Sequence, residues 1–125
     1  MNKSGESVLA AMNFFKFTPD QLLVVHDDIE LDFGYIGFKK GGGLAGHNGL
    51  RSVVNLLNTT EFYRFRLGVS RPGFSNVSSY VLSRFSSEEQ TMIPSLLKKA
   101  ADIFLICLNE ADEPAEQKFQ KVKLI

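Results

Sequence analysis

Segments with helical periodicity alternate along this chain with short apolar runs that are typical of β-strands. The helical spacing of apolar side chains recurs in residues 7–15, 48–57 and 86–108. The strand-like runs are residues 22–25, 35–40 and 62–70. This alternation predicts an α/β fold in which helices cover both faces of a central sheet. Ligands of such folds gather where the strands end.

The composition narrows the classes of protein to which the chain can belong. It has 125 residues, of which 44% are hydrophobic, so we expect one core and a single domain over residues 1–125. Its 14 Lys and Arg balance its 14 Asp and Glu, which excludes a protein that holds nucleic acid by bulk positive charge. Any nucleic-acid site must therefore be local.

Neither a membrane span nor a secretion signal is predicted. The longest apolar run, residues 103–108, is far shorter than the ~20 residues that a spanning helix needs. The N-terminus has no apolar segment behind a basic start, so a cytoplasmic setting is expected. Cys107 is the only cysteine and lies within the apolar run, which predicts a small buried hydrophobe and no disulfide.

A pair of carboxylates follows the first strand-like run. Residues 22–25 are apolar throughout, which predicts a central strand buried on both faces, and His26, Asp27 and Asp28 come next. An ionised Asp27 needs a partner or a solvated cleft, and its useful role is to hold a histidine in the tautomer of a general base. The alternative is an aspartate that forms a turn. His26 points to the opposite strand face and is interpreted as structural, and no metal-site spacing is present.

A glycine-rich segment precedes the second helical segment. Residues 41–46 match the Gly-x-Gly-x-x-Gly pattern of dinucleotide-binding loops. Glu61, the candidate ribose-binding acid, stands at the start of a strand instead of the end, which argues against a dinucleotide site. The loop delivers His47 and Asn48 to a helix N-terminus, a combination that can bind a carbonyl or a phosphate. A plain N-cap role for Asn48 is the open alternative.

Three basic side chains are predicted to lie on two strands. Arg64 and Arg66 share one face of a strand, and Lys39 lies on another strand. If these strands are neighbours, the side chains form a local basic patch suited to phosphate. Ordinary surface charge is the alternative.

Three segments together resemble bacterial peptidyl-tRNA hydrolase. They are residues 22–28 (LLVVHDD), 41–52 (GGGLAGHNGLRS) and 64–69 (RFRLGV). Their order and spacing match that family, as do the Met-Asn-x-Ser-Gly start and the Val-Leu segment at residues 80–85. The likeness covers essentially the whole chain, and the glycine-rich His-Asn block is highly distinctive.

The resemblance implies hydrolysis of the ester that joins a peptide to the 3′ ribose of tRNA, which recycles tRNA, with no metal or organic cofactor. In the family a histidine activates water, and an aspartate at a strand end supports the basic form of that histidine. Asp27 matches this catalytic-site aspartate.

The binding positions follow from the same match. The substrate- and tRNA-binding positions of the family are matched by Asn2, Asn48, Met1, His47, Lys39 and Arg66. The two asparagines match residues that contact the peptidyl end, and Met1 and His47 match flanking pocket residues. Lys39 and Arg66 match basic residues that grip the terminal phosphate of tRNA.

The family fold is a three-layer α/β/α sandwich with a mixed, largely parallel central sheet. The family's catalytic histidine lies upstream of the Met-Asn motif, in a segment that also supplies a central strand, and this chain begins at that motif. The resemblance therefore predicts an N-terminally truncated chain that lacks one strand and the general base, and is impaired or inactive. A non-catalytic tRNA-binding fragment that uses Lys39, Arg64 and Arg66 is the alternative, and a monomer is expected.

Overall fold

The computed structural model describes residues 3–44, 47–71, 85–109 and 118–125. Its elements in chain order are α1 (Ser4–Phe15), the short 3-10 helix η1 (Pro19–Gln21), β1 (Leu23–Asp28), β2 (Tyr35–Lys40), α2 (Asn48–Leu57), β3 (Tyr63–Gly68), α4 (Ser87–Asn109) and β4 (Val122–Lys123). The alternation of helices and strands is confirmed, and the predicted bounds of β2 and α2 hold residue for residue.

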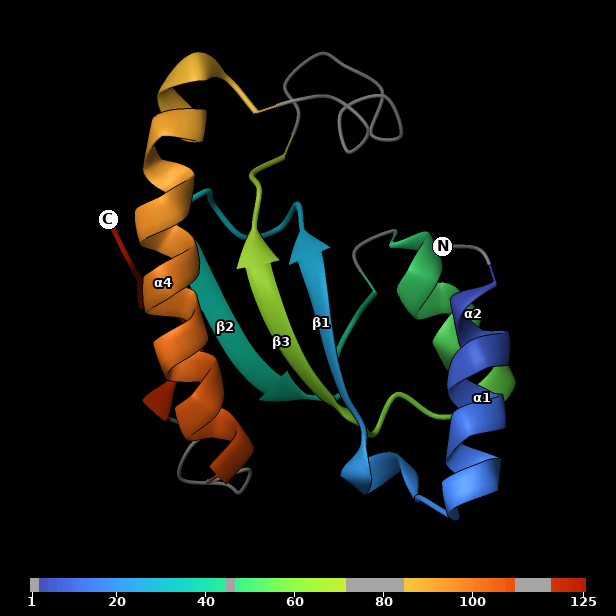
Figure 1. The fold of residues 1–125 in the computed structure, drawn as a ribbon. Helices are drawn as coiled ribbons and strands as arrows, with labels where there is room; N and C mark the ends of the chain where they lie inside the picture. The colour runs from blue at the N-terminus through green and yellow to red at the C-terminus, as the bar shows by residue number, and fades with distance from the viewer. Residues whose placement is uncertain (1–2, 45–46, 72–84, 110–117) are drawn as a thin grey trace.

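The four described strands form one mixed sheet in the order β1-β3-β2-β4 (Figure 1). β1 runs parallel to β3, whereas β2 is antiparallel to both β3 and β4. Three of these strands therefore point the same way, but the opposing strand β2 lies between two of them. The predicted mixed sheet is confirmed. It is largely parallel in strand direction, although only the β1–β3 neighbours are paired in parallel.

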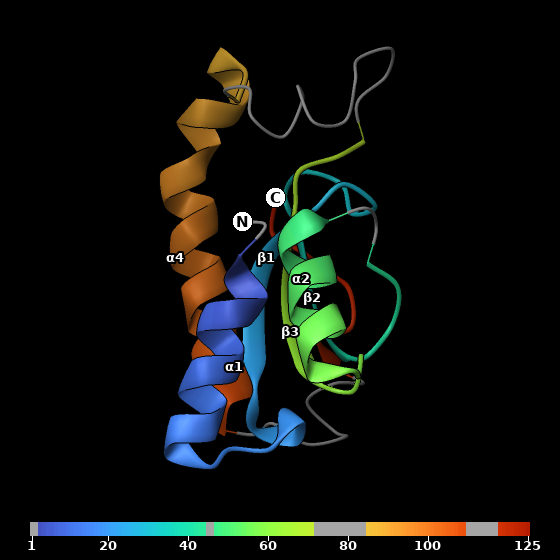
Figure 2. The same cartoon turned by 90° about the vertical axis from the view of Figure 1, so that its right-hand side faces the viewer.

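Helices cover both faces of the sheet, as predicted, and Figure 2 shows α4 and α2 on opposite sides of it. The cluster beneath α4 contains the buried residues Ile36, Phe38, Phe65, Ala100, Cys107 and Phe119. Cys107 is fully buried within this cluster, as the sequence predicts. The α/β/α layering is therefore built around an apolar contact between α4 and the face of β2 and β3.

The long helix α4 begins as predicted but turns a narrower face inward than predicted. The Ser86 hydroxyl accepts the backbone N–H of Glu89 at 3.2 Å, and the Glu89 carboxylate accepts the N–H of Ser86 at 2.9 Å, which completes a capping box. Leu97 and Leu108, which belong to the apolar spacing of residues 86–108, are exposed. The cluster beneath α4 instead takes Ala100, Ile103, Phe104 and Cys107 from this helix.

A second cluster lies on the other face. Leu50 and Val53 of α2 pack with Phe62 there, and Val8 of α1 and Val24 of β1 lie against them. The two faces of β1 thus supply different clusters, since Leu23 packs beneath α4. This alternation explains why residues 22–24 are apolar throughout.

The prediction that residues 22–25 form a central strand is wrong for the described sheet. Among the described strands β1 pairs only with β3, and its Val25 side chain is 49% exposed. β1 also continues through His26, Asp27 and Asp28, although the sequence predicts that these residues follow the strand. An apolar run reports burial above and below a strand, and it carries no information about lateral neighbours.

The C-terminal part adds a strand that the periodicity does not predict. Val122 pairs with Ile36 and Lys123 with Tyr35, so β4 extends the sheet beyond β2.

The Val-Leu segment of the family resemblance, residues 80–85, lies outside the described residues except for its last member. Within the described ranges, no helix is long and apolar enough to cross a membrane.

Replacing Gly5 with alanine is expected to lower the free energy of unfolding by about 1–3 kcal/mol. A Cβ at Gly5 would overlap the backbone carbonyl of Ser52, because α1 crosses α2 at this point and the Gly5 N–H donates to the Ser52 hydroxyl at 2.9 Å. Urea unfolding measures the change. Gly43→Ala is the matched control, since no atom lies within 4 Å of its Cβ position, and an equal loss in both variants would contradict the close α1–α2 contact.

Candidate active site

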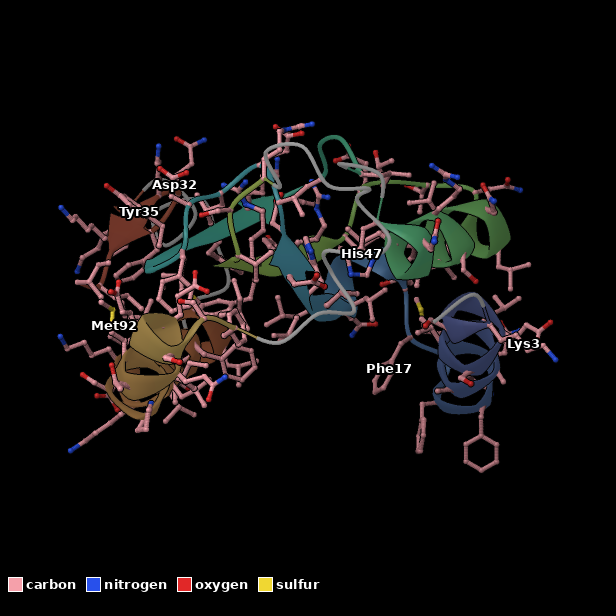
Figure 3. All side chains as sticks on the ribbon, turned by 90° about the horizontal axis from the view of Figure 1, so that it is seen from above. Lys3, Phe17, Asp32, Tyr35, His47 and Met92 are labelled. Carbon is pink, nitrogen blue, oxygen red and sulfur yellow. The ribbon has the colours of Figure 1, made fainter. Side chains whose placement is uncertain are left out.

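Asp27 and His47 come together at the carboxyl end of β1. The Asp27 carboxylate accepts a hydrogen bond from His47 Nε2 at 2.9 Å, although the two residues lie on different elements. Figure 3 shows His47 at the start of α2, beside β1. Asp27 therefore has a histidine partner from the glycine-rich loop, whereas the predicted pairing of Asp27 with a general base stays a prediction.

His47, and not Asn48, is the N-cap of α2. The ring Nδ1 of His47 accepts the backbone N–H of Leu50 at 3.1 Å, and Asn48 is the first residue of the helix. Asn48 is exposed there, next to the Asp27–His47 pair in the chain. Met1 and Asn2 lie outside the described residues. Of the four expected pocket residues, the structure thus places His47 at this site and Asn48 next to it in the chain.

Both ring nitrogens of His47 are occupied. Because Nδ1 accepts from Leu50, the neutral ring carries its proton on Nε2, and that proton is directed at Asp27. A ring in this state has no unoccupied lone pair with which to take a proton from water. His47 therefore orients and is oriented by Asp27, and it does not serve as a general base in this arrangement.

The electrostatics of Asp27 fit a supporting role. The hydrogen bond from His47 lowers the pKa of Asp27 below its ordinary value, against the opposing effect of burial. A carboxylate with a lowered pKa is charged at neutral pH and is a weak proton acceptor. Its side chain is 37% exposed, so it retains access to a further hydrogen-bond donor. Asp27 can thus stabilise a cationic imidazole instead of removing a proton itself.

His26 is buried next to this pair, as predicted for a structural residue. Its Nδ1 donates to the backbone carbonyl of Asp27 at 2.8 Å, and its ring packs edge-on against His47 with the centroids 5.3 Å apart. Nε2 of His26 is buried and has no hydrogen-bond partner. Burial lowers the pKa of His26 from 6.5 to about 4, helped by the charges of His47 and Arg64. The ring is neutral at physiological pH and closed to solvent.

The free energy of unfolding is expected to fall as the pH drops from 6.5 towards about 4, the ordinary and folded-state pKa values of His26. In this window the unfolded chain binds a proton at His26 that the folded chain excludes, so stability rises with pH, by at most about 3 kcal/mol. Urea midpoints across this range measure the slope. In His26→Gln, which cannot titrate, the slope is expected to be shallower, and an unchanged slope would show that His26 does not contribute.

A cavity of about 350 Å³ lies beside β1 and is bounded by α1 and α2. Its polar lining includes Ser4, His26, Asp27 and His47. Most of the remaining wall is aliphatic, with Val8, Val24, Val25, Leu50, Val53 and Leu67. A mainly apolar cavity with a few converging polar groups is the usual form of a small-molecule or peptide subsite.

The predicted basic side chains do lie on neighbouring strands. Lys39 of β2 is paired in register with Arg64 of β3, and Arg66 lies two residues along the same strand face. Arg66 donates from Nη1 to the Asp28 carboxylate at 3.3 Å and from Nη2 to the backbone carbonyl of Gln120 at 3.3 Å. The basic cluster of Lys39, Arg64 and Arg66 therefore adjoins the aspartates at the end of β1.

Lys39 is the member of this cluster that is ready to bind an anion. Burial lowers the pKa of Lys39, and the charges of Arg64 and Arg66 lower it further. In the described ranges no carboxylate forms an ion pair with Lys39. A partly buried ammonium beside two guanidinium groups gains from an incoming anion, because the anion relieves their mutual repulsion.

Arg64 is not available to an anion in the way the sequence predicts. Its side chain is 2% exposed, and its two Nη groups donate to the backbone carbonyls of Gly41 and Gly43. The central position of β3, between β1 and β2, encloses the side chain and directs it at the glycine-rich loop. The expectation that Arg64 contacts tRNA directly is therefore corrected, whereas the proximity of the three basic residues is confirmed.

Comparison with known proteins assigns the chain to a family. A sequence model of the family described as peptidyl-tRNA hydrolase matches residues 1–124. This chain belongs to the peptidyl-tRNA hydrolase family. The resemblance seen in the His-Asn block, the strand end and the basic strand is therefore confirmed.

Individual peptidyl-tRNA hydrolases support the same assignment. The protein of Nitratidesulfovibrio vulgaris is 43% identical over 118 residues, which cover 94% of this chain and 58% of the relative. The protein of Geotalea uraniireducens is 46% identical over 110 residues, which cover 88% and 58% of the two chains. The crystal structure of the peptidyl-tRNA hydrolase from Acinetobacter baumannii matches with a TM-score of 0.82 at 32% identity, over 100% of this chain and 64% of that chain. The chain thus spans less than two thirds of the length of these peptidyl-tRNA hydrolases.

The sequence did not predict the role of two groups at this site of the peptidyl-tRNA hydrolase family member. Asp28, 6% exposed, holds Arg66 and also accepts the backbone N–H of Glu30 at 2.8 Å. Its position beside Asp27 was the available signal. The Gln120 carbonyl reaches Arg66 from the far end of the chain, and no local pattern predicts this contact. Among the described residues, no group of three or more His, Cys, Asp and Glu could hold a metal ion.

Proposed function

We propose that this protein hydrolyses the ester bond of peptidyl-tRNA and releases the peptide and free tRNA. The observation that carries the proposal is the Asp27–His47 pair, joined at 2.9 Å beside an apolar cavity and one residue from the Asp28–Arg66 ion pair. In this arrangement the oriented Asp27 carboxylate would act at the ester, and the basic cluster would bind a phosphate. Membership of the peptidyl-tRNA hydrolase family supports the choice of substrate.

In the proposed reaction, water attacks the ester carbonyl, and the bond to the 3′ oxygen of the ribose breaks. The proton of the attacking water passes to a second water beside the Asp27 carboxylate, and water returns a proton to the leaving ribose oxygen. Neither histidine of the described chain fits the accepting role, because His47 is doubly hydrogen-bonded and His26 is closed to solvent. The Asp27 carboxylate, held ionised by its lowered pKa, stabilises positive charge that develops beside it.

The remaining proposed contacts position the substrate. Lys39 and Arg66 bind the terminal phosphate of tRNA, since both present positive charge on the face of β2 and β3 that is opposite α4. Asn48 is exposed at the first residue of α2, where an amide can contact the peptidyl end. Met1 and Asn2 are proposed to act with it. Action as a cytoplasmic monomer without a metal or organic cofactor is part of the same proposal.

Two assays on one preparation test this function. Release of labelled peptide from peptidyl-tRNA measures hydrolysis, and retention of deacylated tRNA over a salt series measures binding. We expect ester cleavage that requires Asp27, together with salt-sensitive binding that requires Lys39. Binding without cleavage would contradict hydrolysis by this chain, and the absence of both would contradict the choice of tRNA.

A second candidate function is tRNA binding without ester cleavage. It is favoured by one observation, that no described histidine offers an accessible, unoccupied ring nitrogen beside Asp27. The basic cluster would then act alone. Because Arg64 is enclosed, this function would depend on Lys39 and Arg66 for direct contact with phosphate.

A further inference from the structure

Arg64 is a buried cation that no carboxylate of the described residues neutralises. It stands in the middle of the sheet, in register with Val24 of β1 and Lys39 of β2. Burial lowers its pKa, and the charge of Arg66 lowers it further, but a guanidinium remains protonated in proteins. Within the described ranges it forms no ion pair, so its charge is satisfied by other acceptors.

Those acceptors are two carbonyls of the glycine-rich loop. Arg64 Nη1 donates to the carbonyl of Gly43 at 2.6 Å, and Nη2 donates to the carbonyl of Gly41. A planar guanidinium presents these donors in a fixed fork, so it fixes the direction of both carbonyls at once. The residue between them, Gly42, has a φ of +95°, and a Cβ there would lie 2.5 Å from Arg64 Nη2. The bare backbone of the loop therefore lies directly on the guanidinium.

The middle of this loop has little other support. The start of the loop is tied to β3, where the Gly41 N–H donates to the carbonyl of Phe62 at 3.0 Å. At Gly43, by contrast, no atom lies within 4 Å of the Cβ position. Beyond it, the Leu44 carbonyl accepts the N–H of His47 at 2.9 Å. The fork of Arg64 is thus the contact of the sheet with Gly43, while Leu44 beyond it packs against the cluster of Leu50, Val53 and Phe62.

We infer that Arg64 is a positioning residue: its guanidinium holds the loop from Gly41 to Gly43 in the conformation that brings His47 to Asp27. Arg64 acts through the loop and touches neither Asp27 nor His47 by hydrogen bond. Its relevance to catalysis rests on the proposed hydrolysis, whereas its effect on the loop does not. The positive charge of Arg64 also lies near Lys39. A Cβ built at Gly42 would lie 2.5 Å from Arg64 Nη2 and 2.7 Å from Lys39 Nζ.

The test uses nuclear magnetic resonance on the full chain and needs no tRNA. In Arg64→Met, which keeps an apolar stem and loses the fork, hydrogen exchange is expected to accelerate about 10- to 100-fold at the amides of Gly41 and His47, which donate to the carbonyls of Phe62 and Leu44. The Nε2–H signal of His47, which reports the bond to Asp27, is expected to shift or broaden. Core amides beneath α4 are expected to exchange as before.

Two further variants keep the inference falsifiable if Arg64→Met unfolds. Arg64→Lys retains the charge but can reach only one carbonyl, so it is expected to restore the His47 signal in part. Gly42→Ala retains the guanidinium but places a Cβ against its Nη2 and strains the left-handed backbone, so it is expected to disturb the same signals. Arg51→Met, on the exposed side of α2, is the matched control.

The results separate this inference from the proposed function. An unchanged His47 Nε2–H signal and unchanged loop exchange in folded Arg64→Met or Arg64→Lys would overturn the inference, whatever the hydrolysis assay shows. Uniform acceleration at the loop and beneath α4 would also overturn it, because Arg64 would then serve only global stability. If hydrolysis is observed, Arg64→Lys is expected to lower kcat more than it raises KM.

Discussion

Asp27→Asn is expected to slow peptidyl-tRNA hydrolysis by about 10²- to 10⁴-fold, the usual contribution of a positioned acid–base system. Asparagine is nearly the same size and its side-chain oxygen can still accept from His47 Nε2, which lies 2.9 Å from Asp27 in the native chain. What is lost is the negative charge that stabilises positive charge developing beside it in the transition state. Because the lowered pKa keeps native Asp27 ionised at neutral pH, the substitution removes a full charge there.

Asp102→Asn provides the matched control for this prediction. Asp102 is exposed on α4, so the same chemical change at that position leaves the site untouched. Single-turnover release of peptide is the measurement, with tRNA retention measured in parallel. Equal rates for the native chain and Asp27→Asn would contradict the supporting role of Asp27, whereas loss of tRNA binding in Asp27→Asn would indicate a disturbed fold.

The double variant Lys39→Ala and Arg66→Ala is expected to weaken tRNA binding by about 10²-fold or more, since two charge-assisted hydrogen bonds to phosphate are removed. A plot of the logarithm of affinity against the logarithm of salt concentration should also become shallower, by about 0.7–0.9 for each phosphate that is no longer neutralised. Lys39→Ala alone isolates the charge that has no described ion-pair partner. Filter retention over a salt series measures both quantities.

Arg66 requires a more careful design, because it also neutralises the buried Asp28 carboxylate at 3.3 Å. Arg66→Ala leaves that carboxylate without its partner, so Arg66→Lys is used beside it to retain a positive charge. Lys98→Ala, an equal change of charge on the exposed side of α4, is the control. Binding and a salt slope that match the control would contradict the basic cluster as a phosphate site.

Much of the fold could be predicted because helices and strands carry local periodicity. The bounds of β2 and α2 and the capping box at Ser86 depend on residues close in the chain. The strand β4 and the edge position of β1 in the described sheet could not be predicted in this way. Both depend on which strand lies beside which, and that choice is made by contacts between distant segments.

The candidate site likewise combines features that the sequence predicts with features that depend on contacts between distant segments. The family resemblance singled out Asp27, His47, Lys39 and Arg66 as site residues. The structure joins Asp27 to His47 at the start of α2 and places Lys39 on the strand paired with that of Arg66. The resemblance could not show that His47 is the partner of Asp27, because the hydrogen bond joins residues separated by a strand and a loop. The strand pattern alone could not separate Arg64 from Arg66, since both lie on one strand face, whereas the resemblance matched only Arg66 to a tRNA-binding position.

The sequence by itself determined the α/β class, the family and the identity of the chemistry-bearing side chains, because residue type and local spacing are properties of the chain alone. Only the tertiary structure decided what each side chain does. It enclosed Arg64 on two loop carbonyls, occupied both nitrogens of His47 and left Lys39 without a described ion-pair partner. Burial and hydrogen-bond partners set the charge and availability of a group, and they exist only once distant segments are packed together.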